Sequence, residues 1–449
     1  MKFFRFTAIL LILATLTVFS GCSLNFFSVE SLMAPPAQSG RNGEIQKAFN
    51  RIMQNKTIQL KAPVSGEYQT AFISKDLDNN GIEEVIVFYS ESNTEGAVRI
   101  ALMECVDDDW FVSVDIKGSG DGIYDVNFVD INNDGVFEVF VSWTLMDRNT
   151  TRILSVFEPV KKDDGALNLK SIGNEYGVAK AFVDLNLDGN KDLLILYVDD
   201  TGEESKVYFR AFSLSGKRDI TKFGEVSLDG SITSASQIVS DVVPDPKGDY
   251  TRVFLDCVKN ERTIFTEMIY WDNKISEPVR GFANPSSTNA RNNQLKSQDI
   301  DGDGFIEVPE ITTLYGDDRG FSINDDEGFY VVNMIEWTNV KGDSSKQMMK
   351  TVFNPKDGYL LEYSWGDTVT VKFDSLREGL IFYEWNNEAE KSGEELFAIY
   401  YRDISTDNEI PGDILHESDK GIFYYTITAE GSRNGISVES LKSAFTHIE

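Results

Sequence analysis

Four stretches of the chain repeat one pattern of oxygen-bearing side chains around a glycine. The pattern has aspartate at position 1, Asp or Asn at positions 3 and 5, glycine at position 6 and a carboxylate at position 9. Oxygen ligands at this spacing allow a short loop to wrap a hard cation such as Ca²⁺. We therefore expect up to four calcium sites. The four stretches begin at Asp76, Asp130, Asp184 and Asp299.

The main alternative for such a loop is the EF-hand, which ends in a glutamate at position 12 and lies between two helices. In the first three loops, position 12 is occupied instead by Val87, Val141 and Ile195. In the last loop Glu310 falls at position 12, but Pro309 disfavours a continuing helix. β-Branched and aromatic residues flank the loops on both sides, which predicts strands. Position 9 is therefore expected to close each site.

The loops recur at a nearly fixed period. The first three are separated by 54 residues each, and two further units follow 57 and 58 residues later. The first of these further units, at Asp241, has Val243 at position 3 and carries two prolines, so it keeps the repeat without the metal pattern. Each period contains segments with the composition of the strands of a propeller blade. We predict a mainly β fold with a five-bladed β-propeller over residues 64–350.

These units resemble the FG-GAP/VCBS-type repeats of integrin α-subunit propellers and of many secreted bacterial proteins. In that family, a loop of the form Asp-x-Asp/Asn-x-Asp/Asn-Gly-x-x-Asp/Glu joins the first two strands of a blade and binds Ca²⁺. The resemblance covers roughly residues 66–350. Propellers of the family commonly have more blades than the five periods visible here.

The resemblance also implies a ligand set in which position 7 contributes its backbone carbonyl. The first site would contain Asp76, Asp78, Asn80, Ile82 and Glu84. The second would contain Asp130, Asn132, Asp134, Val136 and Glu138. The third would contain Asp184, Asn186, Asp188, Asn190 and Asp192. The fourth would contain Asp299, Asp301, Asp303, Phe305 and Glu307. The alternative is that some loops are Asx-rich turns that hold no metal.

The composition limits the classes of partner and of chemistry. The net charge of −31 repels phosphate backbones, so we expect no nucleic-acid partner. The chain has only two histidines, which disfavours zinc sites and histidine-based catalysis. Three cysteines make no disulfide framework, and Cys105 and Cys257, which lie in apolar runs, are expected to be buried free thiols.

Residues 1–22 have the features of an export signal. Lys2 and Arg5 precede an apolar run, and Cys22 follows it directly. The segment resembles a bacterial lipoprotein signal, which implies that Cys22 becomes lipidated and anchors the chain at the extracytoplasmic face of the cell membrane. The alternatives are an ordinary cleaved signal peptide and an uncleaved anchor.

Two further segments flank the repeats. Residues 23–63 are expected to form a tether and a short amphipathic helix. The apolar face of that helix would carry Ile45, Phe49, Ile52 and Met53. Residues 351–449 lack the period and are predicted to form a small α+β domain of antiparallel strands, closed by a helix that begins after Ser437.

Together these features predict a lipid-anchored, calcium-stabilised propeller that acts as a binding or scaffold protein for a protein or glycan ligand. The alternative is a cell-surface polysaccharide-degrading enzyme or its accessory module, because similar repeats accompany such enzymes. No Gly-x-Ser-x-Gly elbow, phosphate loop or histidine cluster appears, so we predict no enzymatic activity. Four tryptophans could stack on sugars, but their place in alternating strands favours core packing. They are Trp110, Trp143, Trp271 and Trp337.

Overall fold

The computed structural model describes residues 41–448, with short gaps at 92–96, 108, 147, 215–218, 315–320, 326–327, 342–343, 366–367 and 407–409. The predicted signal segment, with Cys22, and most of the tether lie outside the described residues. Strands make up 58% and helices 7% of the structure, which confirms a mainly β protein. None of the helices in the described ranges combines the length and the apolar character that crossing a bilayer requires.

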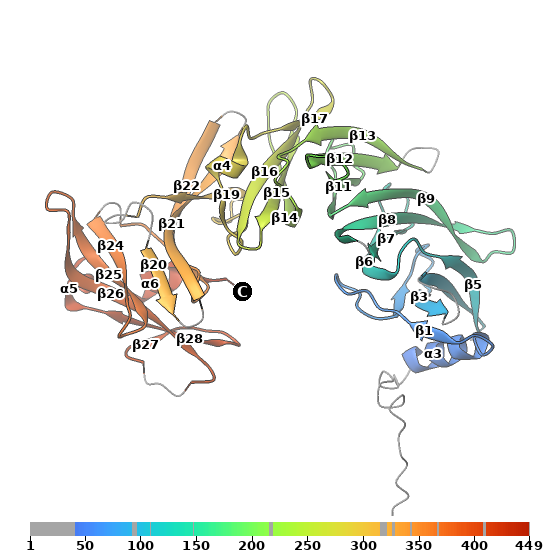
Figure 1. Cartoon of the computed structure of the whole chain (residues 1–449), viewed down its shortest axis with the longest axis horizontal. Helices are drawn as coiled ribbons and strands as arrows, with labels where there is room; N and C mark the ends of the chain where they lie inside the picture. Colours follow the sequence, from blue (N-terminus) through green and yellow to red (C-terminus); the bar gives the residue numbers. More distant parts are fainter. Residues whose placement is uncertain are drawn as a thin grey trace, which may run out of the picture.

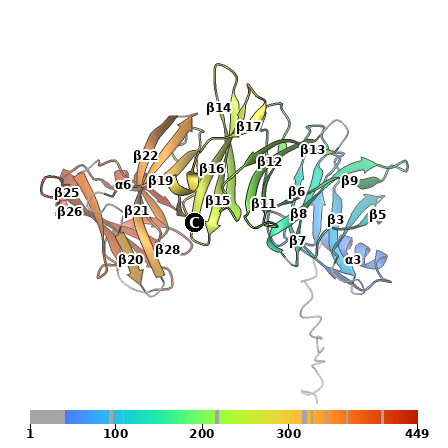
Figure 2. The same cartoon turned by 45° about the horizontal axis from the view of Figure 1, so that its top comes forward.

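Six antiparallel sheets follow one another along an arc (Figures 1 and 2). The helix α3 (Arg41–Ile52) and the first sheet lie at one end, and the C-terminal sheet lies at the other. The first five sheets correspond to the five sequence periods. The described part of the chain does not form the closed ring of the predicted propeller, because both end sheets are covered by other elements.

Each of the first three sheets is built from consecutive strands. The first contains β1 (Ile58–Leu60), β2 (Phe72–Lys75), β3 (Glu84–Glu91), β4 (Arg99–Val106) and β5 (Asp109–Lys117). The second contains β6 (Gly122–Val129), β7 (Glu138–Leu145), β8 (Arg148–Lys161) and β9 (Leu167–Gly177). The third contains β10 (Ala179–Val183), β11 (Asp192–Asp199), β12 (Lys206–Leu214) and β13 (Ile220–Ser227).

The remaining sheets have additional strands. The fourth contains β14 (Ser234–Val243), β15 (Tyr250–Asn260), β16 (Thr263–Asp272), β17 (Glu277–Arg280) and β18 (Arg291–Asn292), which follows the short helix α4 (Pro285–Thr288). The fifth contains β19 (Glu307–Thr312), β20 (Phe321–Asp325), β21 (Gly328–Lys341), β22 (Ser344–Asn354), β23 (Tyr359–Glu362) and β29 (Phe445–His447). The sixth contains β24 (Val369–Asp374), β25 (Gly379–Asn386), β26 (Lys391–Asp403), β27 (Asp413–Glu417) and β28 (Gly421–Ile427).

The central strands of the array bury both of their faces. In β3, Ile86 and Phe88 pack with the second sheet, whereas the alternate residues Val87 and Tyr89 pack with α3. Successive side chains of a strand point to opposite faces of its sheet, so a sheet held between two neighbours is apolar on both faces. The continuous apolar runs that follow the loops in the sequence have this cause.

The same alternation continues along the array. In the third sheet, Leu193 packs toward the second sheet and Leu194 toward the fourth. In the fourth sheet, Leu255 packs toward the third and Phe254 toward the fifth. Each sheet therefore covers the next one, and the two end sheets need a different cover.

The helix α3 covers the outer face of the first sheet. Three of the four residues predicted on its apolar face are buried, namely Ile45, Phe49 and Met53. The ring of Phe49 lies edge-on to the rings of Phe72 and Tyr89, at centroid distances of 5.7 and 5.5 Å. The fourth residue, Ile52, is 38% exposed, although Met53 directly after it is buried in the same apolar cluster as Phe49.

The sixth sheet covers the other end of the array. One apolar cluster contains Met334 of the fifth sheet and Phe382 and Phe397 of the sixth. The predicted domain boundary at residue 350 falls inside β22, and β29 returns to pair with β23. The C-terminal segment therefore shares its core with the repeats.

Two short helices separate β28 from β29. They are α5 (Ala429–Arg433) and α6 (Val438–Ala444). Ser437 caps α6 as its sequence predicts. The Ser437 side chain accepts the N–H of Ser440, and the Ser440 side chain accepts the N–H of Ser437.

Candidate metal centres

Each of the four predicted loops leads directly into a strand of its sheet. The carboxylate at position 9 is the first residue of that strand, in β3, β7, β11 and β19 respectively. This strand is the second of the sheet for the first three loops, and it is the edge strand of the fifth sheet for the last loop. Glu310 lies within β19, so a strand and not a helix follows the last loop. This geometry excludes the EF-hand alternative.

The aspartate at position 1 organises each loop. Its carboxylate accepts the backbone N–H groups of positions 5 and 6 at 2.8–3.1 Å in all four loops. The side chain at position 5 accepts the N–H of position 7 at 2.7–2.9 Å. The glycine at position 6 has a φ of 86–93°, which a residue with a Cβ adopts only with strain.

The carboxylate at position 9 is buried beneath each loop. Glu84 is 4% exposed, and Glu138, Asp192 and Glu307 are 0% exposed. One oxygen of each accepts the N–H of position 2 at 2.9–3.2 Å. The second oxygens of Glu138 and Asp192 are buried and, among the described residues, have no hydrogen-bond partner. Because a buried oxygen without a partner is costly, a bound cation would stabilise this arrangement.

Burial raises the pKa of all four position-9 carboxyls to about 7. Charge repulsion from the aspartates of the same loop is a smaller part of this rise. Binding of a divalent cation requires the ionised carboxylate, so metal binding would compete with protonation at these positions.

In two loops the side-chain oxygens converge closely enough to hold one ion. Within each cluster, one oxygen from every residue lies within 4.8 Å of the others. The clusters are formed by Asp299, Asp301, Asp303 and Glu307, and by Asp76, Asp78 and Glu84. In the second and third loops the asparagine amide at position 3 donates to the aspartate at position 5, at 3.1 and 3.2 Å. The donors are all hard oxygens, which suit Ca²⁺ or Mg²⁺ and not softer metals.

Hydrogen bonds join the loops of neighbouring sheets. The N–H of position 8 donates to the carbonyl of position 2 in the preceding loop, from Phe137 to Leu77 at 2.9 Å and from Lys191 to Ile131 at 3.0 Å. In addition, the Lys161 ammonium at the end of β8 lies 3.0 Å from a carboxylate oxygen of the first loop. The loops therefore lie at the junctions between sheets, along one edge of the array.

The unit at Asp241 replaces the loop with a hairpin. The strand β14 continues past Asp241, which pairs opposite Arg252 of β15. Their ion pair is almost fully buried, with side chains 2% and 1% exposed. Asp241 also accepts the N–H of Ile306 in the last loop, and Arg252 donates to the carbonyl of Val340 in the fifth sheet. An arginine cation thus joins the fourth and fifth sheets. The earlier junctions instead contain the loops with the predicted metal pattern, called metal-type loops below.

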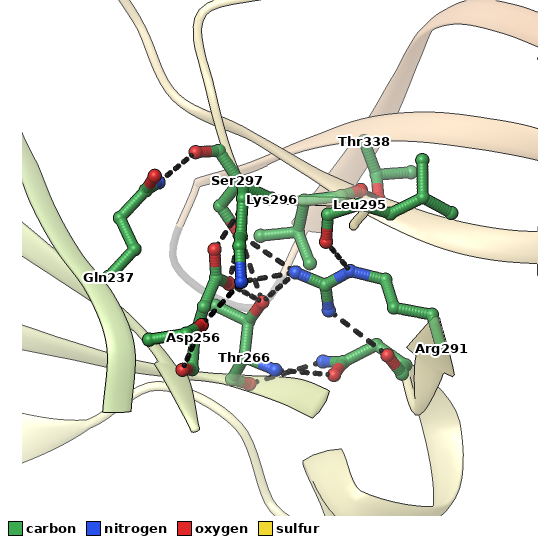
Figure 3. Close-up of polar contacts among 11 residues, drawn as sticks. Gln237, Asp256, Thr266, Arg291, Leu295, Lys296, Ser297 and Thr338 are labelled. Carbon is green, nitrogen blue, oxygen red and sulfur yellow. Dashed lines mark hydrogen bonds and ion pairs between the residues drawn. The ribbon is translucent and has the colours of Figure 1, made fainter. Parts of the chain in front are cut away.

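A second buried ion pair anchors the segment that leads into the last loop (Figure 3). Arg291 donates to Asp256 at 2.7 Å and to Thr266 at 2.8 Å. Asp256 also accepts the N–H and the hydroxyl of Ser297, both at 2.8 Å, and Arg291 donates to the carbonyl of Leu295. These charges are satisfied by the protein itself, so we assign the network a structural role.

The tryptophans considered for sugar stacking lie mostly in the core. Trp143 and Trp337 are fully buried, Trp271 is 9% exposed and Trp110 is half-buried. Two others, Trp365 and Trp385, line a cavity of about 380 Å³ against the sixth sheet. Both lie outside the repeats, so the period offered no reason to single them out.

The cavity of the sixth sheet combines these two indole rings with hydrogen-bonding groups. Glu384, Asn386 and Asn434 also line it, and Asn434 donates to Glu384 at 3.2 Å. Aromatic surface with a few placed polar groups is the usual composition of a small-molecule site.

The two described cysteines are free. Cys257 is buried as predicted, and burial raises the pKa of its thiol, which disfavours the reactive thiolate. Cys105 lies near the end of β4 and is half-buried, so the prediction of a buried thiol is wrong for this residue.

No protein-family model matches the chain, and no curated protein matches it. Three solved structures align with it at low similarity. A protein from Lactobacillus plantarum is 10% identical, with a TM-score of 0.28 over 83% of this chain and 99% of that one. The periplasmic gluconolactonase of Pseudomonas aeruginosa is 10% identical, with a TM-score of 0.28 over 76% and 95%. A levansucrase mutant of B. megaterium is 9% identical, with a TM-score of 0.22 over 68% and 92%.

The gluconolactonase and the levansucrase are enzymes with β-propeller-like folds. This finding contradicts the prediction that the chain has no enzymatic activity, which rested on missing motifs alone. At such TM-scores the alignments assign no particular activity to the chain.

The raised pKa values predict how the stability of the metal-free protein depends on pH. Between the ordinary values of 4.5 for Glu and 3.8 for Asp and the folded value of about 7, the folded state binds more protons than the unfolded state. The free energy of unfolding should therefore fall as the pH rises through this range. Denaturant titration in excess chelator measures it, and Glu138→Gln should make the fall shallower. An equal slope in the variant would contradict the assignment.

The contribution of Arg252 to the fourth junction should not depend on metal. Replacing Arg252 by methionine leaves the Asp241 carboxylate buried without a counter-charge, which costs about 3–5 kcal/mol. The melting temperature should drop, and saturating calcium should not restore it. Arg210→Gln, at a more exposed ion pair of β12, is the control and should have little effect. A variant as stable as the wild type would show that the Arg252 contact does not hold this junction.

Proposed function

We propose that the chain is a calcium-binding protein of the outer cell surface, built from FG-GAP/VCBS-type blades, that engages a glycan. The observation that carries the calcium part is the set of four equivalent loops, each with a buried carboxylate at position 9. In two of them that carboxylate has a buried oxygen with no hydrogen-bond partner in the described structure. Such oxygens are the ones a cation would satisfy.

In this proposal the side chains at positions 1, 3, 5 and 9 hold Ca²⁺, together with the carbonyl at position 7. Bound Ca²⁺ supplies the positive charge that the clustered carboxylates lack. The hydrogen bonds between successive loops then transmit the rigidity of one loop to the next. Metal binding would in this way stabilise the junctions between sheets as well as the loops themselves.

The proposed location rests on the sequence of residues 1–22 and on lipidation of Cys22. Calcium sites suit that location, because extracellular modules bind Ca²⁺ with dissociation constants of about 10⁻⁴–10⁻³ M. Mass spectrometry of the mature N-terminus for a lipid-modified Cys22 tests this part directly.

The cavity of the sixth sheet favours a glycan over a protein partner. It is concave and has indole surface beside a carboxylate and two amides, whereas a protein partner would need a larger exposed surface. The bound glycan is either a ligand or a substrate, and a turnover assay on the bound species distinguishes the two.

Chelation should lower the melting temperature of the purified protein by several degrees, and added Ca²⁺ should restore it, because ligand binding to the folded state stabilises it. Asp299→Asn should weaken the response by removing the carboxylate that accepts the N–H groups of Asp303 and Gly304. Glu203→Gln, at an exposed acid outside the loops, is the matched control. An unchanged melting curve in excess chelator would overturn the calcium proposal.

A glycan array with the purified protein should give binding that Trp385→Ala weakens about tenfold or more, because stacking surface is lost. Tyr176→Ala, at a 48% exposed aromatic residue of β9, is the control and should bind as the wild type does. Equal binding by the Trp385 variant would show that the glycan does not occupy this cavity.

A further inference from the structure

A separate cavity of about 330 Å³ lies where the second, third and fourth sheets meet. It is lined mainly by the strands that begin these sheets, β6, β10 and β14, with contributions from β7 and β8. Its polar lining is unusual for the inner part of a β array. The residues that matter here are Tyr124, Asp125, Ser142, Arg152 and Lys180.

A lysine is held at this cavity from the third sheet. Lys180 is 12% exposed, and its ammonium lies 2.5 Å from a carboxylate oxygen of Asp125 and 2.9 Å from the hydroxyl of Ser142. Both partners belong to the second sheet. Burial lowers the pKa of Lys180, and the Asp125 carboxylate opposes that shift. An additional anion in the cavity would stabilise the charged lysine further.

An arginine lies on the same wall. The Arg152 guanidinium is stacked over the ring of Tyr124, with its central carbon 4.4 Å from the ring centroid. The charged side chains that line the cavity are thus Arg152, Lys180 and Asp125, an excess of one positive charge. This excess stands out in a chain whose net charge is −31.

A hydroxyl group also lines the cavity. The Ser142 side chain accepts a hydrogen bond from Lys180, and a serine hydroxyl that accepts one bond can still donate its own proton to a ligand. A hydroxyl group of the ligand can accept that proton.

We propose that this cavity binds a small carboxylate that also carries hydroxyl groups, of the size of a hexuronic acid. A guanidinium plane matches a carboxylate in two parallel hydrogen bonds, and Lys180 adds a second cation. A ligand hydroxyl pairs with the Ser142 hydroxyl. A volume of about 330 Å³ is at the small end of ligand sites, which suits one sugar ring and not a chain of them. The site is distinct from the cavity of the sixth sheet.

Isothermal titration of the purified protein with glucuronate, and with glucose as the neutral probe, tests the assignment. The wild type should bind glucuronate at least about tenfold more tightly than glucose, because only glucuronate offers the carboxylate. Arg152→Gln should remove most of this preference. Arg210→Gln is the matched control, because Arg210 also stacks on a tyrosine ring, Tyr197, at 4.0 Å and lies away from the cavity.

Equal affinity for glucose and glucuronate, or no binding of either, would overturn the proposal. So would an Arg152 variant that binds as the wild type does. Calcium-dependent melting curves show whether a variant is folded. If Arg152→Gln is not, Ser142→Ala serves instead, and it should weaken glucuronate binding several-fold by removing the hydroxyl that pairs with the ligand. Unchanged binding by that variant would also contradict the assignment.

Discussion

The structure depends on sheets that are apolar on both faces. A strand such as β3 presents Ile86 to one neighbour and Val87 to the other, so no sheet of the array can remain stable with a free face. A closed ring would solve this problem by making every sheet an inner one. This chain solves it with covers, α3 at one end and the sixth sheet at the other (Figure 1). Repeat arrays need such end caps for the same reason.

Face-to-face packing does not fix the position of one sheet relative to the next. Contacts at the edges of the sheets fix it. The metal-type loops provide such contacts at the first junctions, through hydrogen bonds such as that from Phe137 to Leu77. At the fourth junction the contact is made by the buried ion pair of Arg252 and Asp241, in which the cation is a side chain of the protein itself. Contacts of the first kind would respond to the calcium concentration, and the Arg252 contact would not. The fourth junction has both kinds, because Ile306 of the last loop donates to Asp241.

Much of the fold could be predicted from the sequence, because its signals are local. The period, the strands beside each loop and the apolar face of α3 follow from residue spacing. The ring closure could not be predicted, because it depends on whether α3 leaves the face of the first sheet free. The boundary at residue 350 was placed where the period stops, yet β22 runs through it and β29 returns to the same sheet.

Some of the candidate sites could also be predicted from the sequence, and others could not. The loop residues are contiguous, so their spacing alone brings Asp299 and Glu307 together. The cavity around Lys180 could not be predicted, because Asp125, Arg152 and Lys180 come from different strands and meet only through the stacking of sheets. Trp365 and Trp385 likewise become neighbours only in the folded sixth sheet. The lack of known catalytic motifs in the sequence does not by itself exclude enzymatic activity.

The central claim is that the loops bind calcium while the array is folded. Equilibrium dialysis of the purified protein against labelled Ca²⁺ measures the number of ions bound per chain. The account predicts up to four ions, with Asp299→Asn and Asp130→Asn each removing one. A folded wild-type protein that binds no calcium at millimolar concentrations, about the level at which extracellular modules are saturated, would contradict it.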